Sequence, residues 1–304
     1  MRTALAILCR NQERYAPAIA RGVLSQSARP DRVLVVMDRP GLLEKKATEK
    51  AYADVPGCEF LAVGDLPERI ERPPMVEGIA PFCAGRCRNL AMEMLYDVDL
   101  AVFIDGDCIP MPRMLEAHVA AYREGCVTVG RRIEAKWGSE DQRQCSSKHP
   151  IPIFGKEPGT VTSERYIADS GVVWTCNVGI TPGAAGRVRE LNRELYGVPA
   201  VFHPDFWGRW GGEDGFLGME CFYLGIPIRT TPVLGGDGVS HIAHPRPAAK
   251  YDLKSFIAFL EEKRRELLTL MEAAGKYAGE FRSLPQLLEE EKCERSTESR
   301  STCA

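Results

Sequence analysis

The apolar residues of this chain gather in short runs that alternate with segments of helical spacing. Four runs are apolar almost throughout and are predicted to be buried strands: residues 3–9, 32–37, 58–63 and 100–104. Helices are predicted between them, over residues 12–28 and 85–96. Strands that are apolar on both faces and alternate with helices are typical of a parallel sheet covered by helices on both sides.

The second half of the chain continues this alternation less regularly. Further strands and helices are predicted at 126–130, 171–180 and 226–230, and at 114–125, after Pro182, at 213–225 and at 252–275. Residues 131–170 are polar and weakly patterned, which is typical of a functional or mobile stretch. We therefore expect one α/β domain over residues 1–250, a helical extension over 251–288 and a charged, disordered tail over 289–304.

Aspartates follow the predicted strands at the points where the strands end, namely Asp38, Asp65, Asp105 and Asp107. Ligands of such sheets bind at the carboxyl ends of the strands. In the stretch VFIDGDCIP, Gly106 lets the backbone turn sharply, so that both neighbouring carboxylates can face one point. Two carboxylates this close repel each other unless a cation or water lies between them. The pattern predicts either a site for a divalent metal and a nucleotide or a solvated turn.

A second motif, FWGRWGGEDGF, places glycines around a tryptophan ahead of two acids: Gly208, Trp210, Gly211, Gly212, Glu213 and Asp214. Acidic residues in the first turn of a helix are stabilised by the helix dipole, which is a purely structural explanation. The same residues also suit a sugar-acceptor site, because aromatic rings pack on sugar rings and a carboxylate can accept a hydroxyl proton.

Two histidines, His241 and His244, lie in the stretch GVSHIAHPRP, which is predicted to be a loop. An isolated histidine in such a loop is most often structural or exposed. Beside a carboxylate site, one of the two becomes a credible additional metal ligand. Of the two, we favour His244.

The bulk composition narrows the classes of function. The chain has 304 residues and a net charge of −3, so it has no global basic field for nucleic acid. Its eleven cysteines include no CxxC pair, which favours reduced thiols and a cytoplasmic setting. No stretch approaches the roughly 18 apolar residues of a membrane span, and the run 3–9 is too short for a signal peptide. We expect no integral membrane segment.

Over roughly residues 3–245, the chain resembles glycosyltransferases of the GT-A fold, near the family 2 type. The stretch RCRNLAMEMLYDVDLAVFIDGDCIP (86–110) is similar to the family's Ala-Arg-Asn helix, strand and Asp-x-Asp motif. The stretch WGRWGGEDGF (207–216) is similar to the Trp-Gly-Gly-Glu-Asp signature of galactosyltransferases, and TCNVGITP (175–182) to an Asn-bearing strand between the two. The combination in this order is more specific than any one motif.

The resemblance implies a GT-A, Rossmann-like fold and a metal-dependent, hexosyltransferase-like enzyme that inverts the sugar. Asp105 and Asp107 would hold Mn²⁺ or Mg²⁺ on the diphosphate of a nucleotide sugar, with a UDP-sugar as the expected donor. His244 or His241 would complete the metal shell.

The resemblance also implies roles for the remaining site residues. Asp38 and Asp65 would contact the nucleoside of the donor, and Arg88 would lie near it. Asp214 would be the general base, while Glu213 would orient the acceptor. The donor would also be contacted by a mobile loop that includes Trp210, Gly211 and Gly212.

Other functions remain open at this point. A nucleotidylyltransferase of related fold also uses strand-end carboxylates, but it usually needs a glycine-rich loop after the first strand, where this chain has CRNQERYAPA. A non-catalytic sugar-binding or scaffold protein is a further alternative.

The acceptor could be a polysaccharide, a glycoconjugate or a hydroxymethylated DNA base. The basic stretch 131–148, which contains Trp137, could follow a phosphate backbone, although a solvated loop is the preferred explanation.

Overall fold

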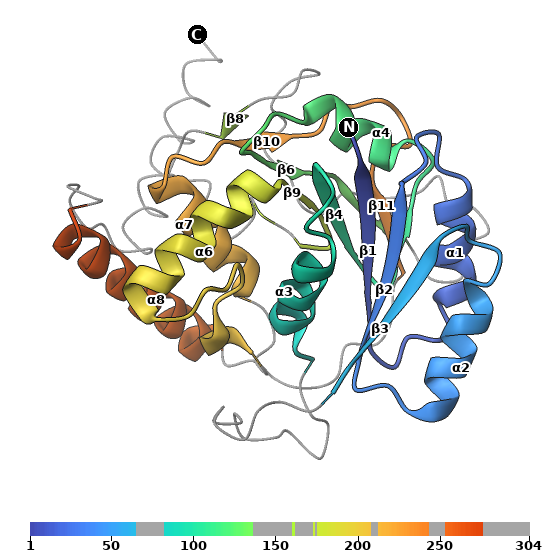
Figure 1. Ribbon diagram of the computed structural model, residues 1–304, viewed down its shortest axis with the longest axis horizontal. Helices are drawn as coiled ribbons and strands as arrows, with labels where there is room; N and C mark the ends of the chain where they lie inside the picture. The colour runs from blue at the N-terminus through green and yellow to red at the C-terminus, as the bar shows by residue number, and fades with distance from the viewer. Residues whose placement is uncertain are drawn as a thin grey trace, which may run out of the picture.

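The first four strands form the parallel half of a central sheet. The computed structural model describes residues 1–64, 82–135, 160–161, 173, 175–207, 212–242 and 253–275. The strands β1 (Thr3–Cys9), β2 (Arg32–Asp38), β3 (Cys58–Val63) and β4 (Leu100–Asp105) pair in the order β3-β2-β1-β4, all in parallel (Figure 1). Every residue of β1 is buried, as its continuous apolar run predicts.

The second half of the sheet is mixed. Next to β4 lies β9 (Asn177–Ile180), which is antiparallel to both of its neighbours, β4 and β6 (Val127–Val129). The sheet then continues through β10 (Ile228–Thr230), parallel to β6, to the antiparallel edge strand β8 (Thr160–Val161). The eight-stranded sheet is therefore mostly parallel, and the predicted α/β class is confirmed. Within the described part of the predicted strand 171–180, only residues 177–180 are extended in the sheet.

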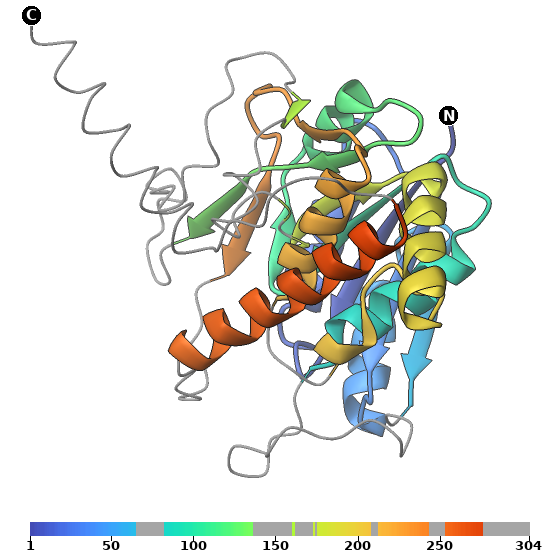
Figure 2. The same ribbon diagram turned by 90° about the vertical axis from the view of Figure 1, so that its left-hand side faces the viewer.

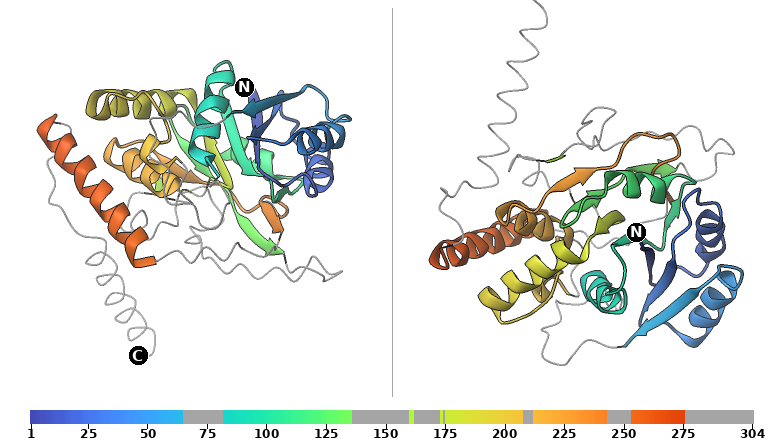
Figure 3. Two further views of the ribbon diagram at one scale, coloured as in Figure 1. Left: turned by 90° about the horizontal axis from the view of Figure 1, so that it is seen from below. Right: turned by 45° about the horizontal axis from the view of Figure 1, so that its top comes forward.

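Helices cover both faces of this sheet (Figures 1 and 3). The helices of the described ranges are α1 (Ala16–Leu24), α2 (Leu42–Ala51), α3 (Ala84–Met94), α4 (Met114–Ala121), α6 (Pro182–Tyr196), α7 (Glu213–Tyr223) and α8 (Leu253–Ala273), with a short 3₁₀ helix η1 (Pro204–Phe206). Of these, α8 packs on the outside of α6 and α7. Side chains alternate along a strand, so β1 packs against the helix layers on both faces of the sheet. Leu5 and Ile7 pack in the layer of α1 and α4, while Ala6 and Leu8 pack in the layer of α3, α6 and α7.

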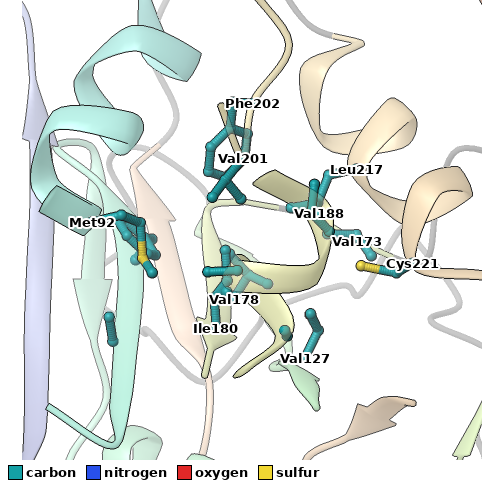
Figure 4. Packing of buried hydrophobic residues seen from close by; sticks show 14 of the residues in the cluster. Met92, Val127, Val173, Val178, Ile180, Val188, Val201, Phe202, Leu217 and Cys221 are labelled. Carbon is teal, nitrogen blue, oxygen red and sulfur yellow. The ribbon is translucent and has the colours of Figure 1, made fainter. Parts of the chain in front are cut away.

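The layer of α3, α6 and α7 extends to the C-terminal helix. Figure 4 shows Met92 of α3, Val178 of β9 and Leu217 of α7 in this cluster. Leu260 and Leu267 of α8 belong to the same cluster, and Figure 2 shows α8 passing in front of α7 and ending beside α6. None of the helices in the described ranges is long and apolar enough to cross a bilayer. The predicted tail 289–304 lies outside the described residues.

A second, three-stranded sheet lies beyond the end of β4. It has the order β5 (Cys108–Pro110), β11 (Val239–Ile242) and β7 (Arg132–Ala135), with β11 antiparallel to β5 and parallel to β7. The prediction of a loop for residues 238–247 is therefore wrong for β11. The strand forms because its partners lie far away in sequence, where a local pattern carries no signal of them.

Candidate active site

The predicted site residues gather at the carboxyl ends of the parallel strands. Asp38 is the last residue of β2, Asp105 is the last residue of β4, and Asp107 follows in the turn to β5. Glu213 and Asp214 open α7. Four of the predicted residues lie outside the described ranges: Asp65, Trp210, Gly211 and His244.

Arg88 of α3 joins the two acidic motifs. Its Nη2 atom donates to Oδ1 of Asp105 at 2.9 Å, and its Nη1 atom donates to Oε1 of Glu213 at 2.9 Å. The guanidinium is buried, with its Cζ atom 5.5 Å from the centre of the Phe202 ring. The D-x-D turn and the acid pair, which lie far apart in sequence, are thus two sides of one site.

The turn between Asp105 and Asp107 is pressed against β1. The N–H of Gly106 donates to the carbonyl oxygen of Leu8 at 2.6 Å. A Cβ atom on Gly106 would lie 2.5 Å from Oε1 of Gln12 and 2.8 Å from that same carbonyl oxygen. Only glycine fits this close approach, so Gly106 fixes where the two carboxylates emerge. Burial, together with the charges of Asp107 and Glu213, raises the pKa of Asp105, although Arg88 opposes the shift.

His241 lies beside Asp107. Its Nε2 atom is 3.5 Å from Oδ2 of Asp107. The pairing of β11 with β5 places His241 opposite Cys108, and the N–H of Ile242 donates to the carbonyl oxygen of Asp107 at 2.8 Å. The structure therefore brings His241 to the D-x-D turn. The preferred candidate, His244, is not described and stays a prediction.

The carboxylate and imidazole at this turn fit a metal that takes most of its ligands from substrate and water. No group of three or more His, Cys, Asp or Glu side chains arranged to hold a metal occurs in the described part of the chain. Metals that bind nucleotide phosphates commonly use one or two carboxylates and complete their shell with phosphate and water. Carboxylate and water ligands suit Mg²⁺ and Mn²⁺, and histidine is the commonest side chain that ligates metals. Asp107 and His241, with Asp105 beside them, match that donor set.

The acid pair directly follows a glycine with left-handed backbone. Gly212, the residue before α7, has φ of 91°. A Cβ atom there would lie 3.0 Å from the Phe206 ring and 3.2 Å from Leu260, so the backbone conformation and the packing both call for glycine. Glu213 is 7% exposed. The Asp214 carboxylate accepts the N–H of Gly215 at 2.8 Å.

The pKa of Asp214 suits a proton acceptor near neutral pH. Burial first, and then the negative charge of Glu213, raise the pKa of Asp214 from 3.8 to about 7, while Arg88 opposes the shift. A carboxyl group with such a pKa exchanges a proton at neutral pH, which is the property a general base needs.

Asp38 is enclosed by donors and has no exposed side-chain surface. It accepts from Nη1 of Arg10 at 2.9 Å, from Nε and Nη2 of Arg39 at 3.0 and 2.9 Å, and from the N–H of Cys83 at 3.1 Å. Arg39 has φ of 49° and Asn11, after Arg10, has φ of 50°. Strained backbone of this kind clusters at functional sites. Sequence reasoning missed both arginines, whose signal was their position directly after β1 and β2.

The asparagine of the TCNVGITP stretch belongs to a buried polar network with α4 and β6. The Oδ1 atom of Asn177 lies 2.8 Å from Nε2 of His118, whose Nδ1 atom lies 2.7 Å from Oγ1 of Thr128. The Nδ2 atom of Asn177 donates to the carbonyl oxygen of Arg131 at 2.9 Å. Burial lowers the pKa of His118 to about 4, so this histidine is neutral at neutral pH and ties β6 and β9 to α4.

Comparison with known proteins shows the fold. The sequence matches no protein-family model, and no curated protein has significant similarity to it. The S. aureus TarS 1–349 structure in complex with UDP-GlcNAc superposes with a TM-score of 0.59 at 14% identity, over 88% of this chain and 66% of that one. GalNAc-T7 with UDP, GalNAc and Mn²⁺ superposes with a TM-score of 0.50 at 13% identity, over 80% of this chain and 44% of that one. This chain thus spans slightly less than two thirds of TarS 1–349, and it has the GT-A glycosyltransferase fold.

Proposed function

We propose that this protein is a metal-dependent, inverting glycosyltransferase that moves a hexosyl group from a nucleotide sugar to an acceptor hydroxyl. The single observation that carries the proposal is the contact of Arg88 with both Asp105 and Glu213. Through this contact, the turn that would hold a metal and a diphosphate lies near the start of α7, where Asp214 would act as the general base. A metal-dependent, inverting glycosyl transfer uses both.

The donor would lie along the edge of the sheet. Asp38 and Asp105 end two strands that are separated by β1. Neighbouring strands lie about 4.8 Å apart, so the two strand ends are separated by about 10 Å, a span that a nucleoside diphosphate can bridge. The nucleoside would lie at the Asp38 end, beside Arg10 and Arg39, and the diphosphate at Asp105 and Asp107. TarS and GalNAc-T7 were both solved with a uridine nucleotide, which supports a UDP-sugar as the donor.

A divalent cation, Mn²⁺ or Mg²⁺, would be held by Asp107 and His241 with Asp105 beside them. When bound, it would neutralise the charge that develops on the departing diphosphate. Two features of the backbone would position these ligands. Gly106 sets the turn against β1, and the β5–β11 pairing sets His241 beside it.

Asp214 would accept the proton of the acceptor hydroxyl. As the oxygen forms its bond to the anomeric carbon, the bond from that carbon to the diphosphate breaks on the opposite side, and the nucleoside diphosphate leaves. One displacement of this kind inverts the anomeric centre. The pKa of Asp214, about 7, leaves a large part of the molecules ionised and ready to act at neutral pH.

The acceptor would be a glycan or glycoconjugate hydroxyl. The basic stretch that could follow DNA lies mostly outside the described residues, and Arg131 within them pairs with Asp237 at 3.6 Å.

The eight described cysteines are free thiols, which favours a reducing compartment such as the cytoplasm.

Binding of nucleoside diphosphates tests the proposal. Titration calorimetry would compare UDP, GDP, CDP and ADP with and without MnCl₂ on the wild type, on Asp107→Asn and on the exposed control Asp54→Asn. We expect at least one nucleotide to bind in a Mn²⁺-dependent way. Asp107→Asn should weaken that binding by at least about tenfold, whereas Asp54→Asn should not change it. No binding by the wild type, or equal binding by Asp107→Asn, would contradict the proposal.

A further inference from the structure

Arg88 is placed where a bound donor cannot reach it. Its side chain is 2% exposed, against 30% for Asp105 and 8% for Glu213. Its two terminal nitrogens each point at one of these carboxylates, and the Phe202 ring lies alongside the guanidinium. The guanidinium therefore lies behind Asp105, and the carboxylates stand between it and the space a donor would occupy.

The charges around Arg88 explain why it stays there. A buried cation needs carboxylate partners, because an unpaired charge in the interior is strongly unfavourable. Burial alone would lower the pKa of Arg88, but the charges of Asp105, Glu213 and Asp214 outweigh it and raise the pKa. Conversely, the three carboxyl groups repel one another, and one guanidinium compensates for that repulsion. Removing the cation would push β4 and the start of α7 apart.

We propose that Arg88 is a positioning residue that sets the distance between the donor site and the general base, and that it does not contact the donor. The proposal rests on the proposed function. Arginine suits this task because its planar fork can bind two carboxylates in fixed directions, here one from β4 and one from α7. Lysine, a point charge on a flexible stem, cannot hold both directions at once.

The same geometry assigns a different role to Glu213 from the one that the resemblance implies. Its Oε1 atom is bound to Arg88, and its Oε2 atom is buried without a hydrogen-bond partner. Glu213 thus anchors the first turn of α7 to α3. Asp214, the next residue, is partly exposed and is the one of the two that can meet an acceptor. Glu213 acts on the reaction through Arg88 and through the placement of Asp214.

The test separates positioning from donor contact by comparing donor affinity with turnover. The variants are Arg88→Lys and Glu213→Gln. The control is Arg113→Lys, because Arg113 also donates two hydrogen bonds to a carboxylate, that of Glu116, but lies away from the site. Titration with the nucleoside diphosphate that the wild type binds gives Kd, and product formation from the corresponding nucleotide sugar gives kcat and donor KM.

We expect Arg88→Lys and Glu213→Gln to lower kcat by about 100-fold, the loss typical of a misplacement of about 1 Å. Their donor KM and nucleotide Kd should stay within about threefold of the wild type, and Arg113→Lys should change none of the three. A donor Kd weakened by more than about tenfold in Arg88→Lys would overturn the inference in favour of direct contact.

Two further outcomes keep the inference separate from folding and from the proposed function. If Arg88→Lys does not fold, Glu213→Gln alone decides: it keeps the shape and an oxygen acceptor, and wild-type kcat in this variant would overturn the inference. If the wild type binds nucleotides and both variants keep wild-type turnover, only the positioning role is contradicted. A wild type that binds no nucleotide overturns the proposed function, and the positioning role with it.

Discussion

The Nε2 atom of His241 lies 3.5 Å from Oδ2 of Asp107, although the two residues lie far apart in sequence. The small sheet β5-β11-β7 creates this relationship, because it sets His241 opposite the residue that follows Asp107. A carboxylate and an imidazole held this close by backbone pairing would form a preorganised pair of ligands for the proposed metal. This pair is what makes a metal at the D-x-D turn a specific prediction.

Replacing His241 tests that pair, and replacing His244 tests the other ligand that the sequence offers. We expect His241→Ala to weaken Mn²⁺ binding in the presence of nucleotide by at least about tenfold, because one of the two closely placed ligands is lost. If His241 is the ligand, as the contact with Asp107 supports, His244→Ala should bind Mn²⁺ within about threefold of the wild type. Calorimetric titration of MnCl₂ into the protein and nucleotide measures both. The reverse order of effects would transfer the role to His244.

The pH dependence of turnover should report Asp214. The pKa of this carboxyl group is raised to about 7, and a general base acts only when ionised. We expect kcat/KM to rise with pH up to a midpoint near 7 and then to level off. Asp214→Asn should lose turnover by at least about 100-fold and still bind the nucleotide. A profile flat between pH 5 and 8 would argue against Asp214 as the base.

Gly212→Ala should damage both stability and activity. The left-handed backbone at φ of 91° costs an alanine about 1–2 kcal/mol, and its Cβ would also press on the Phe206 ring. We expect a lower midpoint of thermal unfolding and a lower kcat, since Glu213 and Asp214 follow directly. The control is Gly186→Ala in α6, where an added Cβ atom would meet no other atom within 4 Å. Because alanine has the higher helix propensity, this substitution should stabilise the protein by about 0.5–1 kcal/mol. Equal unfolding midpoints for the two variants would refute this explanation.

Glu220 should make the protein less stable as pH rises. This residue of α7 is 0% exposed, and burial raises its pKa well above 4.5, with Asn192 offsetting the shift only in part. Between pH 4.5 and the folded-state pKa, the unfolded chain is ionised while the folded chain keeps its proton, so the free energy of unfolding falls as pH increases.

The variant Glu220→Gln removes that dependence. The Oδ1 atom of Asn192 is buried without a partner and can accept a hydrogen bond from the new amide. We expect Glu220→Gln to match the wild type in thermal stability near pH 4 and to exceed it progressively toward pH 8. A constant difference between the two proteins across this range would show that Glu220 does not titrate during unfolding.

The parallel half of the fold could be predicted from the sequence because its strands are apolar on both faces. Strands β1 to β4 were predicted at nearly their observed bounds for that reason. Helix α2 was not predicted, because Leu42 and Leu43 are 68% and 82% exposed and only Thr48 in this helix is buried, so no apolar stripe exists. The antiparallel direction of β9 was also out of reach, since an apolar run carries no information on strand direction.

The residue types of the candidate site leave a signal in the sequence, whereas the contacts between them do not. Strand-end aspartates and helix-start acids leave a local signal, which is why Asp105 and Asp214 were identified. The contact of Arg88 with both acidic motifs depends on how α3 and α7 pack, and the enclosure of Asp38 by Arg10 and Arg39 depends on two strained backbone positions. Neither is encoded in the spacing of residues along the chain.

Release of nucleoside diphosphate from nucleotide sugars tests the central claim most directly. The wild type and Asp214→Asn would be incubated with a panel of UDP- and GDP-sugars and a mixture of glycan acceptors, with MnCl₂ or with EDTA, and the released nucleotide would be quantified. The account predicts release from at least one donor by the wild type with Mn²⁺, and a loss of at least about 100-fold with Asp214→Asn or with EDTA. Release that is equal with EDTA, or equal in Asp214→Asn, would contradict it.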